Sequence, residues 1–146
     1  MAHQQPMTQP MASRMVDPDL VADTADGPAL RGAACDECST TTFPAQERCP
    51  RCSALAMSPT LLPRRGTLWA YTVQHFAPKS PFRHDGEFEP FGLGYVDLGP
   101  VIVEARLTVA DVAVLSPGLP VRLVLVPAFT DGDTTVTTFA FEPEEQ

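Results

Sequence analysis

The stretch C-D-E-C-S-T-T-T-F-P-A-Q-E-R-C-P-R-C, residues 35–52, holds all the cysteines of this 146-residue chain. They form two C-x2-C pairs with ten residues between the pairs: Cys35, Cys38, Cys49 and Cys52. Each C-x2-C turn can aim two thiolates at one point, so two turns at the ends of a short hairpin predict a tetrahedral sulfur cage. The spacer is shorter than the commoner spacing of roughly 15–20 residues, which requires a tight hairpin.

Zn²⁺ is the metal that this cage favours, and iron is an alternative in the same geometry. Two disulfides are a further alternative. The grouping in close pairs and the lack of a visible export signal argue against disulfides. Four protein ligands leave no open coordination position, so we expect the zinc to be structural and not catalytic.

Composition restricts the class of protein. The apolar fraction of 44% is sufficient for a packed core, and sixteen prolines argue against a helical bundle. No apolar run approaches the roughly 18 residues of a membrane span. The first residues, MAHQQPMTQP, lack a basic region followed by an apolar stretch. We therefore expect a cytoplasmic protein with no membrane partner.

The distribution of residue types along the sequence divides the chain into three parts. Residues 1–28 are interpreted as a flexible tail and a short helix, with Asp17 as its cap and Pro18 at its first position. Residues 29–65 form the cysteine ribbon, which is too small to fold unaided and depends on the metal. Residues 66–146 form the remaining domain.

This last part is mainly β. A small five-stranded Greek-key barrel, the OB-fold, is the architecture that this number and length of strands favours. The turns Gly99-Pro100 and Asp131-Gly132-Asp133 join neighbouring strands. The predicted strands are residues 67–76, 91–98, 101–107, 121–126 and 135–141.

A family resemblance rests on these same segments. The chain closely resembles the domain of unknown function 35 family in four features. These are the ribbon, the Phe43-Pro44 before its second cysteine pair, the R-R-G-T-L-W-A-Y-T-V-Q-H segment, and the later G-L-G-Y-V-D-L and V-E-A-R-L strands. The resemblance covers about residues 29–141. It implies a rubredoxin-type zinc ribbon followed by an OB-fold, with the four cysteines as metal ligands. Arg106 matches a basic position of the family, whereas Ser39 and Ser53 replace its usual glycines.

The resemblance also implies an accessory role in acyl-CoA metabolism. Such proteins accompany thiolase-like or aldolase-like subunits that carry out condensing, acyl-transfer or retro-aldol chemistry, and the catalytic group lies on the partner. The chain agrees with this, because it has no cysteine outside the cage, no G-x-S-x-G and no phosphate-binding glycine loop. We expect a non-catalytic subunit with no activity alone, with acyl-CoA as a candidate ligand.

Two groups of residues are candidates for contact with CoA or with the partner. Arginines make the ribbon the only basic part of the chain, and phenylalanines lie in the long loop 77–90 between the first two barrel strands. We predict that ribbon and loop share one contact surface; the alternative is a solvated surface with rings that cap the barrel. The candidates are Arg48, Arg51, Arg64, Arg65, Phe82 and Phe88.

Other notable side chains are given structural interpretations. His75 and His84 are expected to be solvated or structural, because neither has an evident catalytic partner. Trp69 and Tyr71 alternate on one strand, so core packing is predicted for both.

A nucleic-acid-binding module is the alternative function, because zinc ribbons and OB-folds both serve that use. Net charge discriminates between this function and that of an accessory subunit. The chain carries −8 overall, and residues 66–146 contain four basic and eleven acidic residues. Since neutralisation of phosphates supplies most nucleic-acid affinity, we expect no nucleic-acid partner.

Overall fold

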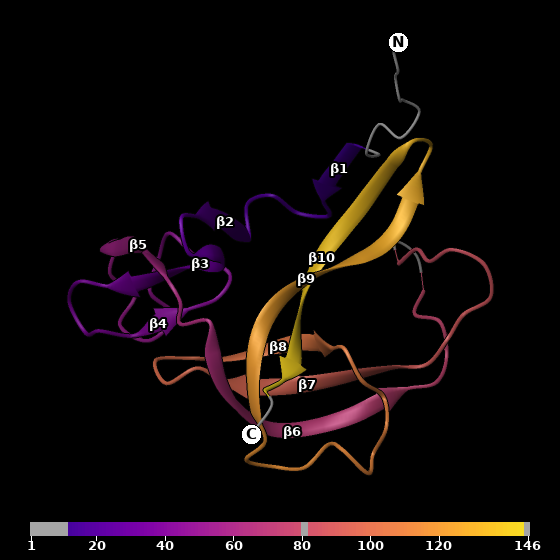
Figure 1. The fold of residues 1–146 in the computed structure, drawn as a ribbon. Helices are drawn as coiled ribbons and strands as arrows, with labels where there is room; N and C mark the ends of the chain where they lie inside the picture. Colours follow the sequence, from indigo (N-terminus) through magenta and orange to yellow (C-terminus); the bar gives the residue numbers. More distant parts are fainter. Residues whose placement is uncertain (1–11, 80–81, 145–146) are drawn as a thin grey trace.

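The computed structural model describes residues 12–79 and 82–144, and in these ranges the chain consists of strands and turns with no helix (Figure 1). This confirms the mainly β class. The strands are β1 (Ala12–Met15), β2 (Val21–Thr24), β3 (Gly27–Cys35), β4 (Thr41–Thr42), β5 (Met57–Leu61), β6 (Arg65–Gln74), β7 (Phe91–Asp97), β8 (Ile102–Leu107), β9 (Pro120–Asp131) and β10 (Thr134–Pro143). No helix that could cross a membrane occurs in the described ranges.

The ribbon is organised around β3. Strand β2 pairs antiparallel with the first half of β3, and β4 and β5 pair antiparallel with its second half. Gly32 allows a close approach here, because a Cβ at this position would lie 2.6 Å from the carbonyl oxygen of Thr42. Strand β3 ends at Cys35, where the first cysteine turn begins.

The barrel is a closed ring of five strands. Strands β6, β7 and β8 form an antiparallel meander, β8 pairs in parallel with β10, β10 pairs antiparallel with β9, and β9 returns to β6. Alternate residues of β8 are buried, as expected for a strand with one face toward a barrel interior. The five-stranded OB-fold predicted from the sequence is confirmed.

Ribbon and barrel share one hydrophobic core. Leu68, Val96 and Phe141 are buried inside the barrel, and Leu30 of the ribbon belongs to the same cluster. A second contact lies nearer the surface, where the ring of Phe43 meets that of Phe139 on β10 edge to face, with centroids 5.7 Å apart. The ribbon and the barrel are therefore held together by apolar packing as well as by their covalent connection.

The β9–β10 hairpin continues past the barrel. Its outer part, residues 126–138, and β1 form a three-stranded extension that we call the arm (Figure 1). The predicted turn at its tip is confirmed, because Asp131 pairs with Thr134 and Gly132 has a φ of 62°. Arg14 of β1 forms an ion pair with Asp131 at 3.0 Å.

The prediction for the N-terminal segment is wrong where the structure can test it. Residues 1–11 of the predicted tail lie outside the described residues. Residues 12–15 form β1, and the predicted helix is replaced by a turn and β2. Asp17 does accept a hydrogen bond, from the Asp19 amide at 3.0 Å, but it caps only that turn. A helix ending before Gly27 would be too short to be stable alone, whereas β2 gains hydrogen bonds from β3.

The prediction for Trp69 is also wrong. A β-bulge interrupts the pairing of β6 with β7 between Leu68 and Ala70. Trp69 follows the buried Leu68 and is 60% exposed. The extra residue in the bulge turns Tyr71 to the opposite face, where it packs against the core. Trp69 instead meets Tyr95 of β7 on the outer surface, with ring centroids 6.3 Å apart.

Candidate functional site

Both cysteine turns have the same backbone geometry. The amide of Ser39 donates to the carbonyl oxygen of Cys35, and the amide of Ser53 donates to that of Cys49, each at 2.9 Å. The two serines have φ angles of 67° and 66°, in the left-handed region. Glycine adopts this conformation with less strain than a residue that carries a Cβ.

Backbone amides also point at the sulfur atoms. Cys35 Sγ accepts from the Glu37 amide at 3.4 Å, and Cys49 Sγ accepts from the Arg51 amide at 3.4 Å. Hydrogen bonds of this kind stabilise a thiolate relative to a thiol. The turns are therefore shaped for ionised sulfur.

The four sulfur atoms converge. Each lies within 4.8 Å of the others, and the pairs Cys35–Cys52 and Cys38–Cys49 are each 3.6 Å apart. A tetrahedral Zn²⁺ with Zn–S bonds of about 2.3 Å requires sulfur–sulfur distances of about 3.8 Å. The arrangement fits a four-thiolate metal site, and it does not contain a disulfide.

Proton affinities differ within the cage. Hydrogen bonding to the Thr40 side chain and amide lowers the pKa of Cys38 to about 6. The amide of Cys52 lowers the pKa of Cys49. At Cys52 the amide of Ala54 also lowers the pKa, but desolvation and the neighbouring sulfurs outweigh it and raise the pKa to about 12. Four negative charges cannot be collected here without a cation, which is what a structural metal supplies.

Three of the four candidate arginines are engaged within the chain. Arg48 donates to the carbonyl oxygen of Ser53 at 2.6 Å and so supports the second cysteine turn. Arg64 donates to Pro28 and Thr24 at 3.0 and 2.8 Å and holds the β2–β3 hairpin. Arg65 pairs with Glu144 at 3.0 Å.

Arg51 differs from these three. The Arg51 side chain is exposed and makes no hydrogen bond or ion pair with any described residue, and only its backbone amide is engaged, by Cys49 Sγ. It is therefore the ribbon arginine most available to another molecule. A contact of any of the four arginines with CoA or a partner remains a prediction.

The aromatic residues of the long loop gather into one cluster. The rings of Phe82, Phe88 and Phe91 meet with centroid distances of 5.8 to 6.3 Å, and His84 packs on Phe82 and Phe88 at 5.9 and 5.5 Å. Phe76 is not part of this contact set and is 80% exposed. The structural interpretation of His84 agrees with its ring contacts, and His75 is exposed.

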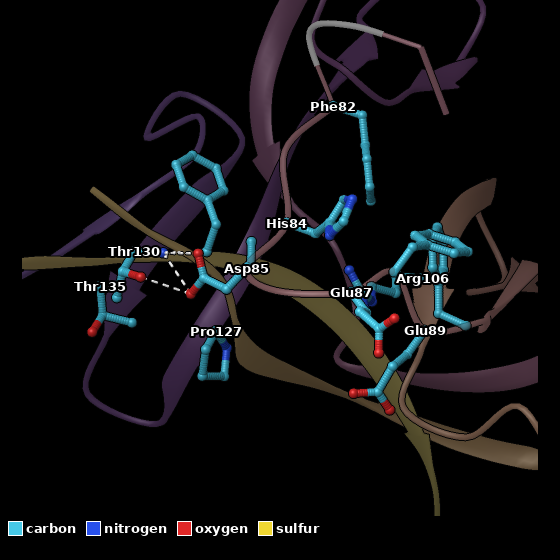
Figure 2. A pocket seen from close by; sticks show the side chains of 13 residues that line it. Phe82, His84, Asp85, Glu87, Glu89, Arg106, Pro127, Thr130 and Thr135 are labelled. Carbon is cyan, nitrogen blue, oxygen red and sulfur yellow. Dashed lines mark hydrogen bonds between the residues drawn. The ribbon is translucent and has the colours of Figure 1, made fainter. Parts of the chain in front are cut away.

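The cluster lines a pocket of about 370 Å³ beside the arm, which we call the aromatic pocket (Figure 2). Asp85 fixes the loop to β9. It accepts hydrogen bonds from the Thr130 amide and hydroxyl, and these bonds lower its pKa. Arg106 of β8 also lines the pocket, with its Cζ 4.3 Å from the centre of the Phe91 ring.

The ribbon and the loop do not form one surface. In Figure 1 the ribbon (β2–β5) lies at one end of the barrel and the loop after β6 lies at the other. The barrel separates the arginines of the ribbon from Phe82 and Phe88. The loop faces residues that sequence reasoning did not single out, such as Phe129 and Thr130, because their proximity depends on how far the β9–β10 hairpin extends.

Comparisons with known proteins match both parts of the chain. Residues 25–58 match the family model described as the ChsH2 rubredoxin-like zinc ribbon domain, and residues 60–126 match the ChsH2 C-terminal OB-fold domain. The sulfur geometry and the first match together establish a structural zinc site, formed by Cys35, Cys38, Cys49 and Cys52.

Two individual proteins are also similar. A DUF35 domain-containing scaffold protein of Methanocaldococcus jannaschii is 29% identical over 122 residues, which cover 77% of this chain and 79% of that protein. A solved structure described as an Ltp2-ChsH2(DUF35) aldolase has a chain with a TM-score of 0.58 and 23% identity, covering 79% of this chain and 84% of that one. With both of its folded parts matched in order, this chain belongs to the DUF35 family.

Proposed function

We propose that this protein is a non-catalytic accessory subunit of an acyl-CoA-processing complex, and that its partner is a thiolase-fold or aldolase-like enzyme. The observation that carries the proposal is the use of all four cysteines in one cage. A thiolase-type reaction needs a cysteine nucleophile, and this chain has none to spare. For a thiolase-type reaction, the cysteine nucleophile would then belong to another subunit.

The similar proteins support the same assignment. One relative is described as a scaffold protein, and the similar solved structure is described as an aldolase that contains a DUF35 chain. A scaffold role and a place in an aldolase assembly are both in keeping with an accessory subunit. A rigid zinc ribbon joined to a barrel through a shared core is suited to hold a partner in a fixed orientation.

Contact with the partner is expected at more than one surface. An interface of ordinary size buries about 800 Å² on each side, and one loop is too small to supply that area alone. Arg51 on the ribbon and the exposed Trp69–Tyr95 pair on the barrel are side chains of the kinds that dominate interfaces. CoA phosphates are a candidate ligand for Arg51.

The test is reconstitution with a thiolase-fold or aldolase-like protein encoded beside this one. The zinc-loaded chain alone should leave acyl-CoA thioesters unchanged, and the mixture should elute as a complex and show turnover. Arg51→Glu should slow association and alter its salt dependence, while Arg122→Glu on the barrel serves as the charge-matched control. Turnover by the purified chain alone, abolished by a point mutation in it, would place the catalytic group here and overturn the proposal.

A further inference from the structure

A second hollow adjoins the aromatic pocket and shares Phe91, Arg106 and Phe129 with it. It has a volume of about 340 Å³ and lies between the outer face of β7–β8 and the arm, and we call it the arm groove. Leu93 and Phe91 of β7 form one wall. Phe129 of the arm and Phe139, the next residue of β10 after the arm, form the other. The groove is mainly apolar, and its size is at the lower end of the roughly 300–1,000 Å³ typical of small-molecule sites.

Arg106 is placed in this groove by the strand alternation. Val103, Ala105 and Leu107 point into the barrel, so Arg106 points outward beside its cross-strand neighbour Leu93. Its side chain is half-buried and lies over the Phe91 ring. Burial lowers its pKa, and no described residue forms an ion pair or a hydrogen bond with it.

The charges around Arg106 leave it without a counter-ion. Glu104 lines the arm groove, and Glu87 and Glu89 line the aromatic pocket, but all three are exposed and none forms an ion pair with Arg106. A second guanidinium, that of Arg83, lines the groove and lies 4.2 Å from the centre of the Phe129 ring. Two arginines stacked on rings thus line the arm groove, which is mainly apolar and is lined by one carboxylate, that of Glu104.

We propose that the arm groove is a binding site for a small amphipathic carboxylate. Its apolar body lies against Leu93, Phe129 and Phe139, and its carboxylate accepts two parallel hydrogen bonds from Arg106. A guanidinium whose face is covered by a ring still presents its N–H edge, which matches a carboxylate in plane. The partly desolvated setting strengthens that pair relative to one at a fully exposed surface.

The test uses the full zinc-loaded chain alone and is independent of any partner enzyme. Naphthalene-2-carboxylate and octanoate are titrated while amide shifts are followed by NMR, with 2-naphthalenemethanol and 1-octanol as neutral comparators. Variants are Arg106→Gln and Arg106→Lys. The control is Arg31→Gln, which removes the same charge from the exposed surface of β3 in the ribbon.

We expect the carboxylates to bind at least tenfold more tightly than the alcohols, with shifts at Leu93, Arg106 and Phe139. Arg106→Gln should weaken carboxylate binding at least tenfold and leave alcohol binding and the melting temperature nearly unchanged. Arg106→Lys should retain part of the preference, and Arg31→Gln all of it. Equal affinity for acid and alcohol, shifts located elsewhere, or unchanged binding in Arg106→Gln would each overturn the site. None of these results bears on reconstitution with a partner. The proposed carboxylate site and the proposed accessory function can therefore be overturned independently of each other.

Discussion

Asp85 and Thr130 are 45 residues apart in the chain and are joined by three hydrogen bonds. The two carboxylate oxygens of Asp85 accept from the Thr130 amide at 3.1 and 3.0 Å, and one of them accepts from the Thr130 hydroxyl at 2.7 Å (Figure 2). This contact holds the long loop against β9 of the arm. It thereby keeps Phe82 and Phe88 beside the aromatic pocket.

Replacement of Asp85 should therefore loosen the loop without unfolding the barrel. In Asp85→Asn the amide retains one acceptor oxygen but loses the charge, so we expect exchange of the Thr130 amide hydrogen to become severalfold faster. Hydrogen exchange followed by NMR measures this directly. Asp133→Asn, on the same hairpin, should leave the exchange unchanged, and equal acceleration in both variants would refute a specific Asp85–Thr130 contact.

The same contact predicts a dependence on pH. Hydrogen bonds from Thr130 lower the pKa of Asp85 below its ordinary value of 3.8. A group with a depressed pKa contributes stability above its unfolded pKa and loses it as the pH falls through the folded value. Protection of the Thr130 amide should thus be constant at neutral pH and decrease only below about pH 4. The Asp85→Asn variant should lack this decrease.

The serines at the ends of the cysteine turns should be replaceable with a gain in stability. Ser39 and Ser53 have positive φ angles, a conformation that is strained for residues with a Cβ. Ser39→Gly and Ser53→Gly should each raise the free energy of unfolding of the zinc-loaded protein by about 0.5–1 kcal/mol. Denaturant titration gives the value. Ser39→Ala is the control, because it removes the hydroxyl and keeps the Cβ, so a gain in that variant would contradict the strain argument.

Loss of the metal should affect the barrel as well as the ribbon. Cys49→Ser removes one thiolate from the cage, and we expect zinc content to fall from about one per chain toward zero. Because Leu30 of the ribbon is packed in the same core as Phe141 of the barrel, the barrel should also lose stability. Elemental analysis and thermal unfolding test this, and re-addition of zinc to the chelator-treated native chain should restore stability. A barrel with an unchanged melting temperature would show that the two parts are energetically independent.

The ring contact between Phe43 and Phe139 offers a direct measure of that coupling. Edge-to-face aromatic pairs contribute about 0.5–1.5 kcal/mol beyond their buried area. A double-mutant cycle with Phe43→Leu and Phe139→Leu should therefore give a coupling energy in that range. Phe43→Leu combined with Phe88→Leu, whose rings do not meet, should give additive effects.

The spacing of the cysteines was sufficient to predict the metal site. Cys35 and Cys38, like Cys49 and Cys52, are separated by two residues, and local backbone geometry alone brings each pair of sulfur atoms together. The five strands of the barrel followed from short β-rich runs between turns such as Gly99-Pro100 for a similar reason. Both predictions depend on residues that are near one another in the sequence.

Features that depend on long-range pairing were decided only by the tertiary structure. Strand β1 exists because the β9–β10 hairpin extends far enough to offer an edge. Trp69 and Tyr71 lie on opposite faces because a bulge shifts the register of β6 on β7. The groove at Arg106 likewise needs β8, the loop and the arm at once. Pattern in a single segment carries little information on such contacts, because a shift of one residue in the pairing moves a side chain to the opposite face of the sheet.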